Sequence, residues 1–258
     1  MPSPICLPLA HLDRMTDSTG LIQHAIYSVP RRESGYTTDD NARALRLCAR
    51  LWNESPDERV LTRVSCYLSF LEHARHPVRG FHNFLSYQRD WLDAGGTGDC
   101  QGQAVLALAE VLGSNLPSGI RSLARELLDG ALPVLAELRS LRAQAYVIQA
   151  WAMLRRATLE DTGPMEDIAR CAADRLVDCF QRSQRPDWHW FEVQMIPGVF
   201  VNRSNCPSWG TSFHLGRSRT TPNSPLRVVS RPSSSRGTTW SVNWLSRQHG
   251  LSTRSVIL

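Results

Sequence analysis

The sequence predicts an all-α protein whose helices form an incomplete (α/α) toroid, in which outer helices wrap a ring of inner ones. From residue 40 to about 184, helical patterns follow one another across short Pro, Gly, Asn or Ser breaks, and no convincing strand interrupts them. Helices that are apolar on nearly all sides also alternate with amphipathic helices. This alternation is expected when enclosed helices take turns with half-exposed ones.

Six helices are expected, with ends that are accurate to a few residues. They span residues 40–52, 57–75, 100–113, 118–138, 141–157 and 165–183. The second is amphipathic, with apolar side chains such as Val60, Val64 and Leu71 at helical spacing. Residues 104–112 and 143–154, by contrast, are apolar nearly all round. Inner helices therefore start near 40, 100 and 142, which is too uneven for a solenoid of fixed period; an irregular bundle is the other alternative.

The last 66 residues differ in composition from the rest. Residues 193–258 hold 13 serines and 8 of the 29 arginines but no acid, whereas all 24 Asp and Glu residues come before them. Such a segment buries little apolar surface, so we expect a disordered or poorly packed tail. The predicted domains are a partial toroid of about three and a half hairpins over 1–192 and an Arg/Ser-rich irregular tail over 193–258.

Composition excludes several classes of protein. With 42% hydrophobic residues the chain can form a sizeable core, but it has no apolar run long enough for a membrane span. The first ten residues lack the basic region of a secretory signal, so a cytoplasmic location is expected. The net charge of +5 comes from the tail, and the basic residues are all arginine. No nucleic-acid recognition motif accompanies them, so no specific nucleic-acid partner is expected.

Cysteine and histidine spacing does not indicate a metal site. The seven cysteines are an odd number and contain no C-x-x-C pair, which favours reduced thiols over a disulfide framework. His73 and His76 lie three residues apart, but no second pair of ligands accompanies them. We therefore expect neither a metal nor another cofactor.

Acidic residues at three expected helix entrances predict the rim of a pocket. The segment Gly35-Tyr-Thr-Thr-Asp-Asp-Asn-Ala-Arg-Ala-Leu45 places Asp39 and Asp40 behind two threonines where a helix starts. A glycine-rich turn brings Asp99 to the start of another helix, and Trp188-His-Trp-Phe-Glu192 supplies a third acidic turn. A carboxylate in such a position also caps the helix, so a purely structural role is the alternative for each residue.

The connection over residues 76–99 is long for a link between helices, and long loops in compact domains are often functional. It contains Tyr87 and Trp91 together with several acids. This mixture suits carbohydrate, because sugar rings present apolar C–H faces to aromatic rings and hydroxyls to carboxylates. Trp91 could equally fill a hydrophobic gap.

Five segments in order resemble a known family, the all-helical domain found C-terminal to, or encoded beside, certain bacterial glycosyltransferases. This family belongs to the six-hairpin glycosidase-like (α/α)6 toroids. The matching segments are residues 11–20 with 23–25, 35–44, Tyr87-Gln-Arg-Asp-Trp-Leu92 with Gly98-Asp-Cys-Gln-Gly102, Arg142-Ala-Gln-Ala-Tyr146, and 188–192. The resemblance covers roughly residues 8–192 and then stops, which predicts a truncated toroid, as a shifted reading frame would produce.

The resemblance implies an oligosaccharide or glycan as ligand and suggests a glycosyltransferase as partner. The nucleotide-sugar fold is absent, so transferase activity is not carried over. If the pocket is catalytic, one carboxyl would protonate the leaving oxygen of a glycosidic bond and another would activate water or phosphate. The catalytic candidates are Asp39, Asp40, Asp99 and Glu192, and the substrate-binding candidates are Tyr36, Asn41, Arg43, Trp91, Gln101 and Trp190. Two alternatives stay open: a non-catalytic glycan-binding accessory domain, and an inactive fragment.

Overall fold

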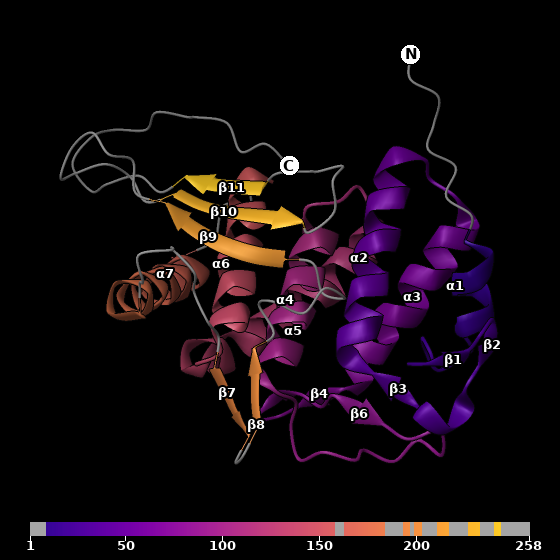
Figure 1. Ribbon diagram of the computed structural model, residues 1–258. Helices are drawn as coiled ribbons and strands as arrows, with labels where there is room; N and C mark the ends of the chain where they lie inside the picture. Colours follow the sequence, from indigo (N-terminus) through magenta and orange to yellow (C-terminus); the bar gives the residue numbers. More distant parts are fainter. Residues whose placement is uncertain are drawn as a thin grey trace. The chain divides into compact units, whose positions relative to one another are not determined.

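A computed structural model describes residues 9–157 and 163–183 and five strands between residues 193 and 243. The helices in these residues are α1 (Ala10–Met15), α2 (Thr38–Glu54), α3 (Glu58–His73), α4 (Gly98–Leu112), α5 (Ser118–Glu137), α6 (Leu141–Arg156) and α7 (Gly163–Ser183) (Figure 1). All six helices expected from the sequence are present, and none differs by more than two residues at either end. The short helix α1 was not expected.

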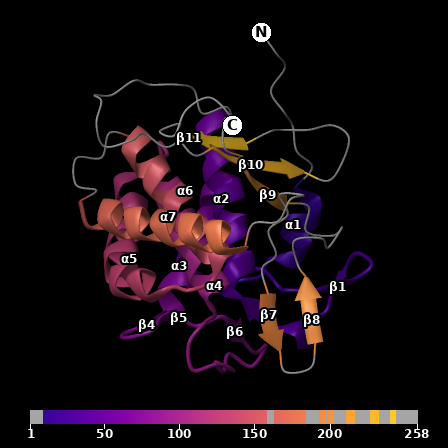
Figure 2. The same ribbon diagram turned by 60° about the vertical axis from the view of Figure 1, so that its left-hand side comes forward.

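Three inner helices, α2, α4 and α6, lie side by side and run in the same direction (Figures 1 and 2). Near the ends of α2 and α4, the side chain of Arg50 donates to Glu110 over 2.9 Å. At the starts of α4 and α6, Ser140 donates to Asp99 over 3.1 Å. The beginnings of these three helices therefore meet at one end of the layer, which we call the inner mouth.

Helix α4 is the central inner helix, and its residues 100–109 are all buried. Its contact with α6 is close because residue 102 is a glycine. A Cβ atom at Gly102 would lie 2.8 Å from the ring of Tyr146 and 3.1 Å from the Cα of Ala143. The burial on all sides agrees with the apolar sequence that predicted an enclosed helix.

Each inner helix is followed along the chain by an outer one. Helix α3 packs against α2, and α5 packs against α4. Helix α7 follows α6 and contributes Met165 and Ala169 to the common core. The chain is thus all-α, with three hairpins in the inner–outer order of an α/α toroid. The further half hairpin expected around residues 188–192 lies outside the described residues.

Short strands connect the helices near the inner mouth, including in residues 75–85, where the sequence analysis expected none. The pairs are β1 (Ala25–Ile26) with β2 (Val29–Pro30), β3 (Tyr36–Thr37) with β6 (Phe84–Leu85), and β4 (Arg75–His76) with β5 (Gly80–Phe81), all antiparallel. The expectation was wrong because strands of two residues are too short to show an alternating pattern. The β3–β6 pair, with Tyr36 opposite Leu85, fastens the long connection to the start of α2.

Internal contacts divide the chain into two compact units, Met1–Asp174 and Arg175–Leu258, so that the division falls within α7. In the second unit, β7 (Val193–Ile196) pairs with β8 (Val199–Asn202). A three-stranded antiparallel sheet has the order β11 (Trp240–Asn243), β10 (Arg227–Pro232), β9 (Thr211–Gly216). Outside these strands, the irregular tail and its boundary after Glu192 stay predictions. Within the described part of the chain, no helix is both long and apolar enough to cross a membrane.

Candidate functional site

The entrance of α2 is held by two threonines that precede the acidic pair. The hydroxyl of Thr37 accepts a hydrogen bond from the backbone N–H of Asp40 over 3.3 Å and donates to the Asp40 carboxylate over 2.7 Å. Thr38 donates its hydroxyl to the carbonyl of His82 over 2.6 Å. The cap expected from the sequence therefore exists, and it also binds α2 to the long connection.

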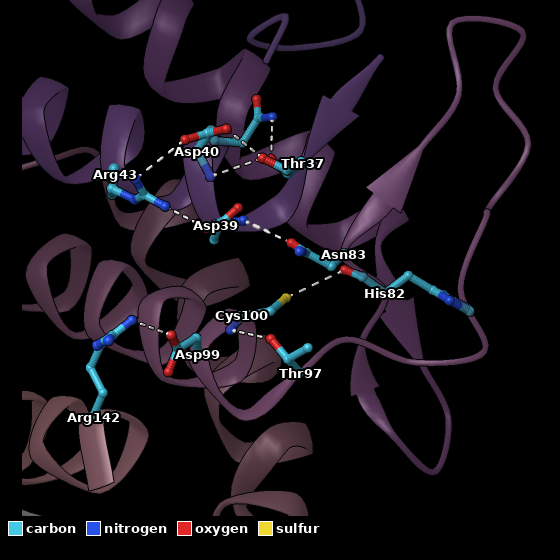
Figure 3. A network of polar contacts seen from close by, with 11 residues as sticks. Thr37, Asp39, Asp40, Arg43, His82, Asn83, Thr97, Asp99, Cys100 and Arg142 are labelled. Atoms are coloured by element: carbon cyan, nitrogen blue, oxygen red, sulfur yellow. Dashed lines mark hydrogen bonds and ion pairs between the residues drawn. The ribbon is translucent and has the colours of Figure 1, made fainter. Parts of the chain in front are cut away.

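Asp39 and Asp40 lie in the first turn of α2 at the inner mouth, each with about three quarters of its side chain buried. Arg43, one turn further on, bridges them (Figure 3). Its guanidinium forms a hydrogen-bonded ion pair with Asp39 and lies 3.4 Å from the Asp40 carboxylate. Residues three and four apart on a helix are neighbours, which makes this bridge possible.

The carboxyl group of Asp40 has a raised pKa. Burial is the main cause, because the charged form loses hydration, and the neighbouring charge of Asp39 acts in the same direction. The hydrogen bond from Thr37 and the charges of Arg43 and His24 oppose the shift without cancelling it. Asp40 therefore holds a proton more readily than an ordinary aspartic acid.

This shift predicts a pH-dependent gain in stability for Asp40→Asn. The pKa of Asp40 is higher in the folded chain than its ordinary value of 3.8 in the unfolded chain. Protonation of Asp40 therefore favours the folded state at pH values below 3.8, and this contribution is lost as the pH rises through the folded-state pKa. Above its folded-state pKa, Asp40 therefore carries a buried charge that asparagine lacks. We expect the stability advantage of the variant to grow as the pH rises through that pKa and to shrink as the pH falls below it. Urea unfolding at several pH values measures it, and a difference that is constant with pH would contradict the expectation.

Asp99 occupies the corresponding position in the first turn of α4. Its carboxylate forms a 2.6 Å ion pair with Arg142 and accepts the Ser140 hydroxyl over 3.1 Å. Ser140 also caps α6 by accepting the N–H of Ala143 over 3.4 Å. Asp99 thus joins the starts of α4 and α6, in addition to lying at the inner mouth.

Cys100 lies between the acidic groups of α2 and α4 (Figure 3). Its thiol donates to the carbonyl of His82 over 3.6 Å, and burial raises the pKa of the thiol well above its ordinary value. The charges of Asp39, Asp93 and Asp99 are close enough to add to that shift. Carboxylates that begin two inner helices, Asp39 on α2 and Asp99 on α4, thus both act on the Cys100 thiol. Glu192 and Trp190 lie outside the described residues.

Two of the predicted substrate-binding residues of the α2 entrance are buried and bonded within the protein. Asn41 is fully buried; its amide accepts from the N–H of Leu21 over 2.8 Å and donates to the carbonyl of Thr37 over 2.8 Å. Tyr36 is 2% exposed, and its hydroxyl donates to Asp17 over 2.7 Å. The polar atoms of both residues thus bond within the protein and hold the entrance of α2, and contact of either residue with a sugar stays a prediction.

Gln101, another predicted substrate-binding residue, is also buried, with 1% of its surface exposed. Its amide accepts from the N–H of Phe81 over 3.0 Å and donates to the Phe81 carbonyl over 2.8 Å. Trp91 stacks on His82 at 4.9 Å between ring centres and meets the edge of Phe70 at 6.0 Å. Trp91 therefore packs against an aromatic cluster, as the gap-filling alternative expected.

Two polar residues that organise the site, Arg142 and Asp93, were not among the candidates predicted from the sequence. Arg142 was noticed only as part of a matching segment, although its place at the start of the third inner helix was a usable signal. Asp93 accepts hydrogen bonds from the N–H groups of Asn83 over 2.8 Å and Phe84 over 3.2 Å. No local pattern indicates the role of Asp93, because its partners lie about ten residues away in an irregular loop.

Among the described residues, no group of three or more His, Cys, Asp or Glu side chains could hold a metal ion. The Nδ1 atom of His76 accepts hydrogen bonds from the N–H groups of Val78 over 3.1 Å and Arg79 over 3.0 Å. Four of the described cysteines are free thiols: Cys48, Cys66, Cys100 and Cys171.

Comparisons with known proteins rest on structure alone, because neither a family model nor a curated protein matches the sequence. The fold is similar to cellobiose 2-epimerase from Spirochaeta thermophila, with 16% identity, a TM-score of 0.54, and coverage of 72% of this chain and 53% of that one. Cellobiose 2-epimerase from Bacillus thermoamylovorans has 16% identity and a TM-score of 0.55, with 75% and 56% covered. A polysaccharide lyase has 14% identity and a TM-score of 0.50, with 67% and 57% covered.

These similarities show that the chain shares the α/α-toroid fold. The match covers little more than half the length of the solved structures. Identities of 14–16% show the fold alone, and the activity of the protein has to be argued from its own residues.

Proposed function

We propose that this chain is a carbohydrate-active α/α-toroid domain that binds an oligosaccharide at the inner mouth and cleaves a glycosidic bond by acid–base catalysis. The observation that carries the proposal is the difference between neighbouring carboxyl groups. The pKa of Asp40 is raised by burial, whereas Asp39 and Asp99 form close ion pairs with arginines. Carboxyl groups in contrasting environments suit the separate roles of acid and base.

In the proposed reaction, Asp40 donates its proton to the glycosidic oxygen as the bond from that oxygen to the anomeric carbon breaks. A water or phosphate oxygen forms the new bond to the anomeric carbon, and Asp39 or Asp99 accepts the proton when water attacks. Arg43, which contacts both carboxylates of α2, would hold them in place and stabilise negative charge on them. The enzymes named among the structural neighbours act on cellobiose and polysaccharide, which supports an oligosaccharide as ligand.

The test is an assay of hydrolysis and phosphorolysis with gluco- and manno-oligosaccharides. Asp40→Asn should lower kcat at least about 100-fold, because an amide cannot supply the proton. Oligosaccharide binding by this variant, followed by calorimetry, should stay close to that of the parent. Turnover that survives Asp40→Asn would exclude the proposed acid.

Asp57→Asn is the matched control for this experiment. Asp57 caps the outer helix α3 by accepting the N–H of Arg59 over 2.7 Å, whereas Asp40 supports the cap of the inner helix α2 by accepting the Thr37 hydroxyl. Its replacement should leave turnover unchanged. A similar loss in both variants would show that the effect comes from capping and not from proton transfer.

A second candidate function is a non-catalytic glycan-binding domain that serves a glycosyltransferase. The pairing of the site carboxylates with Arg43 and Arg142 favours it, because ion-paired carboxylates can accept hydrogen bonds from sugar hydroxyls without exchanging a proton. Binding of oligosaccharide by the parent without turnover would support this alternative. The glycosyltransferase partner and the truncation after Glu192 rest on the sequence resemblance. Sequencing the locus for a downstream frame that encodes further hairpins tests the truncation.

A further inference from the structure

Gln103 on α4 is a buried amide whose oxygen atom, Oε1, has no hydrogen-bond partner within the described structure. Only 9% of the surface of Gln103 is exposed, so its unpaired oxygen lies in the protein interior. Buried polar side chains are nearly always paired, since an unmet acceptor in the interior is destabilising. An unpaired buried amide in a functional region therefore needs an explanation.

The neighbouring glutamine shows what a structural amide in this helix looks like. Gln101, two residues earlier, makes hydrogen bonds to the N–H of Phe81 over 3.0 Å, to the Phe81 carbonyl over 2.8 Å and to the Gly96 carbonyl over 3.3 Å. Those bonds fasten the long connection to α4. Within the described residues, the Oε1 atom of Gln103 makes no comparable bond.

The position of Gln103 on the helix links it to the candidate site. Asp99, Gln103 and Glu110 are separated by four and seven residues and so share one face of α4. The outer two of the three reach across to the adjacent inner helices: Asp99 pairs with Arg142 over 2.6 Å, and Glu110 pairs with Arg50 over 2.8 Å. Gln103 lies one turn below Asp99 on this polar face.

Tyr146 of α6 borders the same region. Its ring lies against Gly102, the residue next to Gln103. Burial raises the pKa of its phenol, and the charges of Arg142, Asp99 and Arg43 are close enough to influence that pKa. Charged groups of the inner mouth therefore lie within electrostatic range of a ring that packs beside Gln103.

We propose that Gln103 is a specificity-determining residue whose Oε1 atom accepts a hydrogen bond from a hydroxyl group of the bound sugar. A hydroxyl fits better than an anion, because Oε1 is itself an acceptor and Asp99 and Glu110 on the same face would repel negative charge. The proposed ligand is thus a neutral sugar. It has a free hydroxyl that reaches one turn of α4 beyond Asp99, past the glycosidic bond that is cleaved at the inner mouth. This inference rests on the proposed function and deepens it.

The experiment compares Gln103→Met with Gln101→Met, because methionine keeps the length of glutamine and removes its polar atoms. Gln103→Met should leave the melting temperature unchanged or higher, since it removes an unpaired group, and should weaken binding of cello- or manno-oligosaccharides about three- to tenfold. Gln101→Met should lower the melting temperature by several degrees, because three backbone groups lose their partner. Circular dichroism and calorimetry give the two readouts.

The outcomes separate this inference from the function on which it rests. If the parent binds none of these oligosaccharides, the proposed function fails and the role of Gln103 fails with it. If the parent binds and Gln103→Met binds equally well, only the role of Gln103 is overturned. A melting temperature lowered as much as in Gln101→Met would also overturn it, by showing that the amide is structural.

Discussion

Replacing Gly35 with alanine is expected to destabilise the protein by roughly 4 kcal/mol, through a strained backbone combined with a direct collision. Gly35 has φ 61° and ψ −145°, a conformation that is essentially restricted to glycine. A Cβ atom there would lie 2.2 Å from the carbonyl oxygen of Leu85. The obstructing atom belongs to the backbone of β6, so no side-chain rotation relieves the collision.

Guanidinium unfolding of the parent and of Gly35→Ala measures this effect. Gly119→Ala is the matched control, because Gly119 lies in α5 and a Cβ atom there meets nothing within 4 Å. The control should be stabilised by about 0.5–1 kcal/mol, as expected for glycine to alanine in a helix. If Gly35→Ala lowers the free energy of unfolding by less than about 1 kcal/mol, β3 and β6 can separate without destabilising the rest of the unit, and the expectation is wrong.

Asn41→Leu should cost about 3 kcal/mol, because the leucine keeps the volume but leaves buried backbone groups without partners. The N–H of the half-buried Leu21 loses its acceptor, and the carbonyl of the fully buried Thr37 loses a donor. Because Thr37 caps α2 beside Asp40, we also expect weaker glycan binding.

The control for Asn41→Leu is Asn53→Leu. Asn53 likewise accepts a hydrogen bond from a backbone N–H, that of Asn115 over 2.8 Å, but it is exposed to solvent. Water can replace that bond, so the loss should stay within about 1 kcal/mol. Equal losses in the two variants, measured by urea unfolding, would contradict the importance of burial at Asn41.

The helices of this protein were predictable because each buries a periodic apolar face, a signal carried by neighbouring residues. Neighbouring residues also placed Asp39, Asp40 and Asp99 at helix entrances, since threonine caps and glycine turns precede them. The sequence pattern did not show whether a polar side chain faces a ligand or the backbone. Gln101 and Gln103 differ in this respect only through the loop that packs on one face of α4, and contacts between distant segments leave no trace in a local pattern.

The shared direction of α2, α4 and α6 has an electrostatic consequence. Each helix carries a dipole equivalent to about half a positive charge at its first turn, so three such ends bring about one and a half positive charges to the same place. This potential partly offsets the mutual repulsion of Asp39, Asp40 and Asp99. It also disfavours the cation of Arg142 in the first turn of α6, which Asp99 neutralises from the adjacent helix. An acidic cluster therefore costs less free energy here than it would at the opposite ends of the same helices.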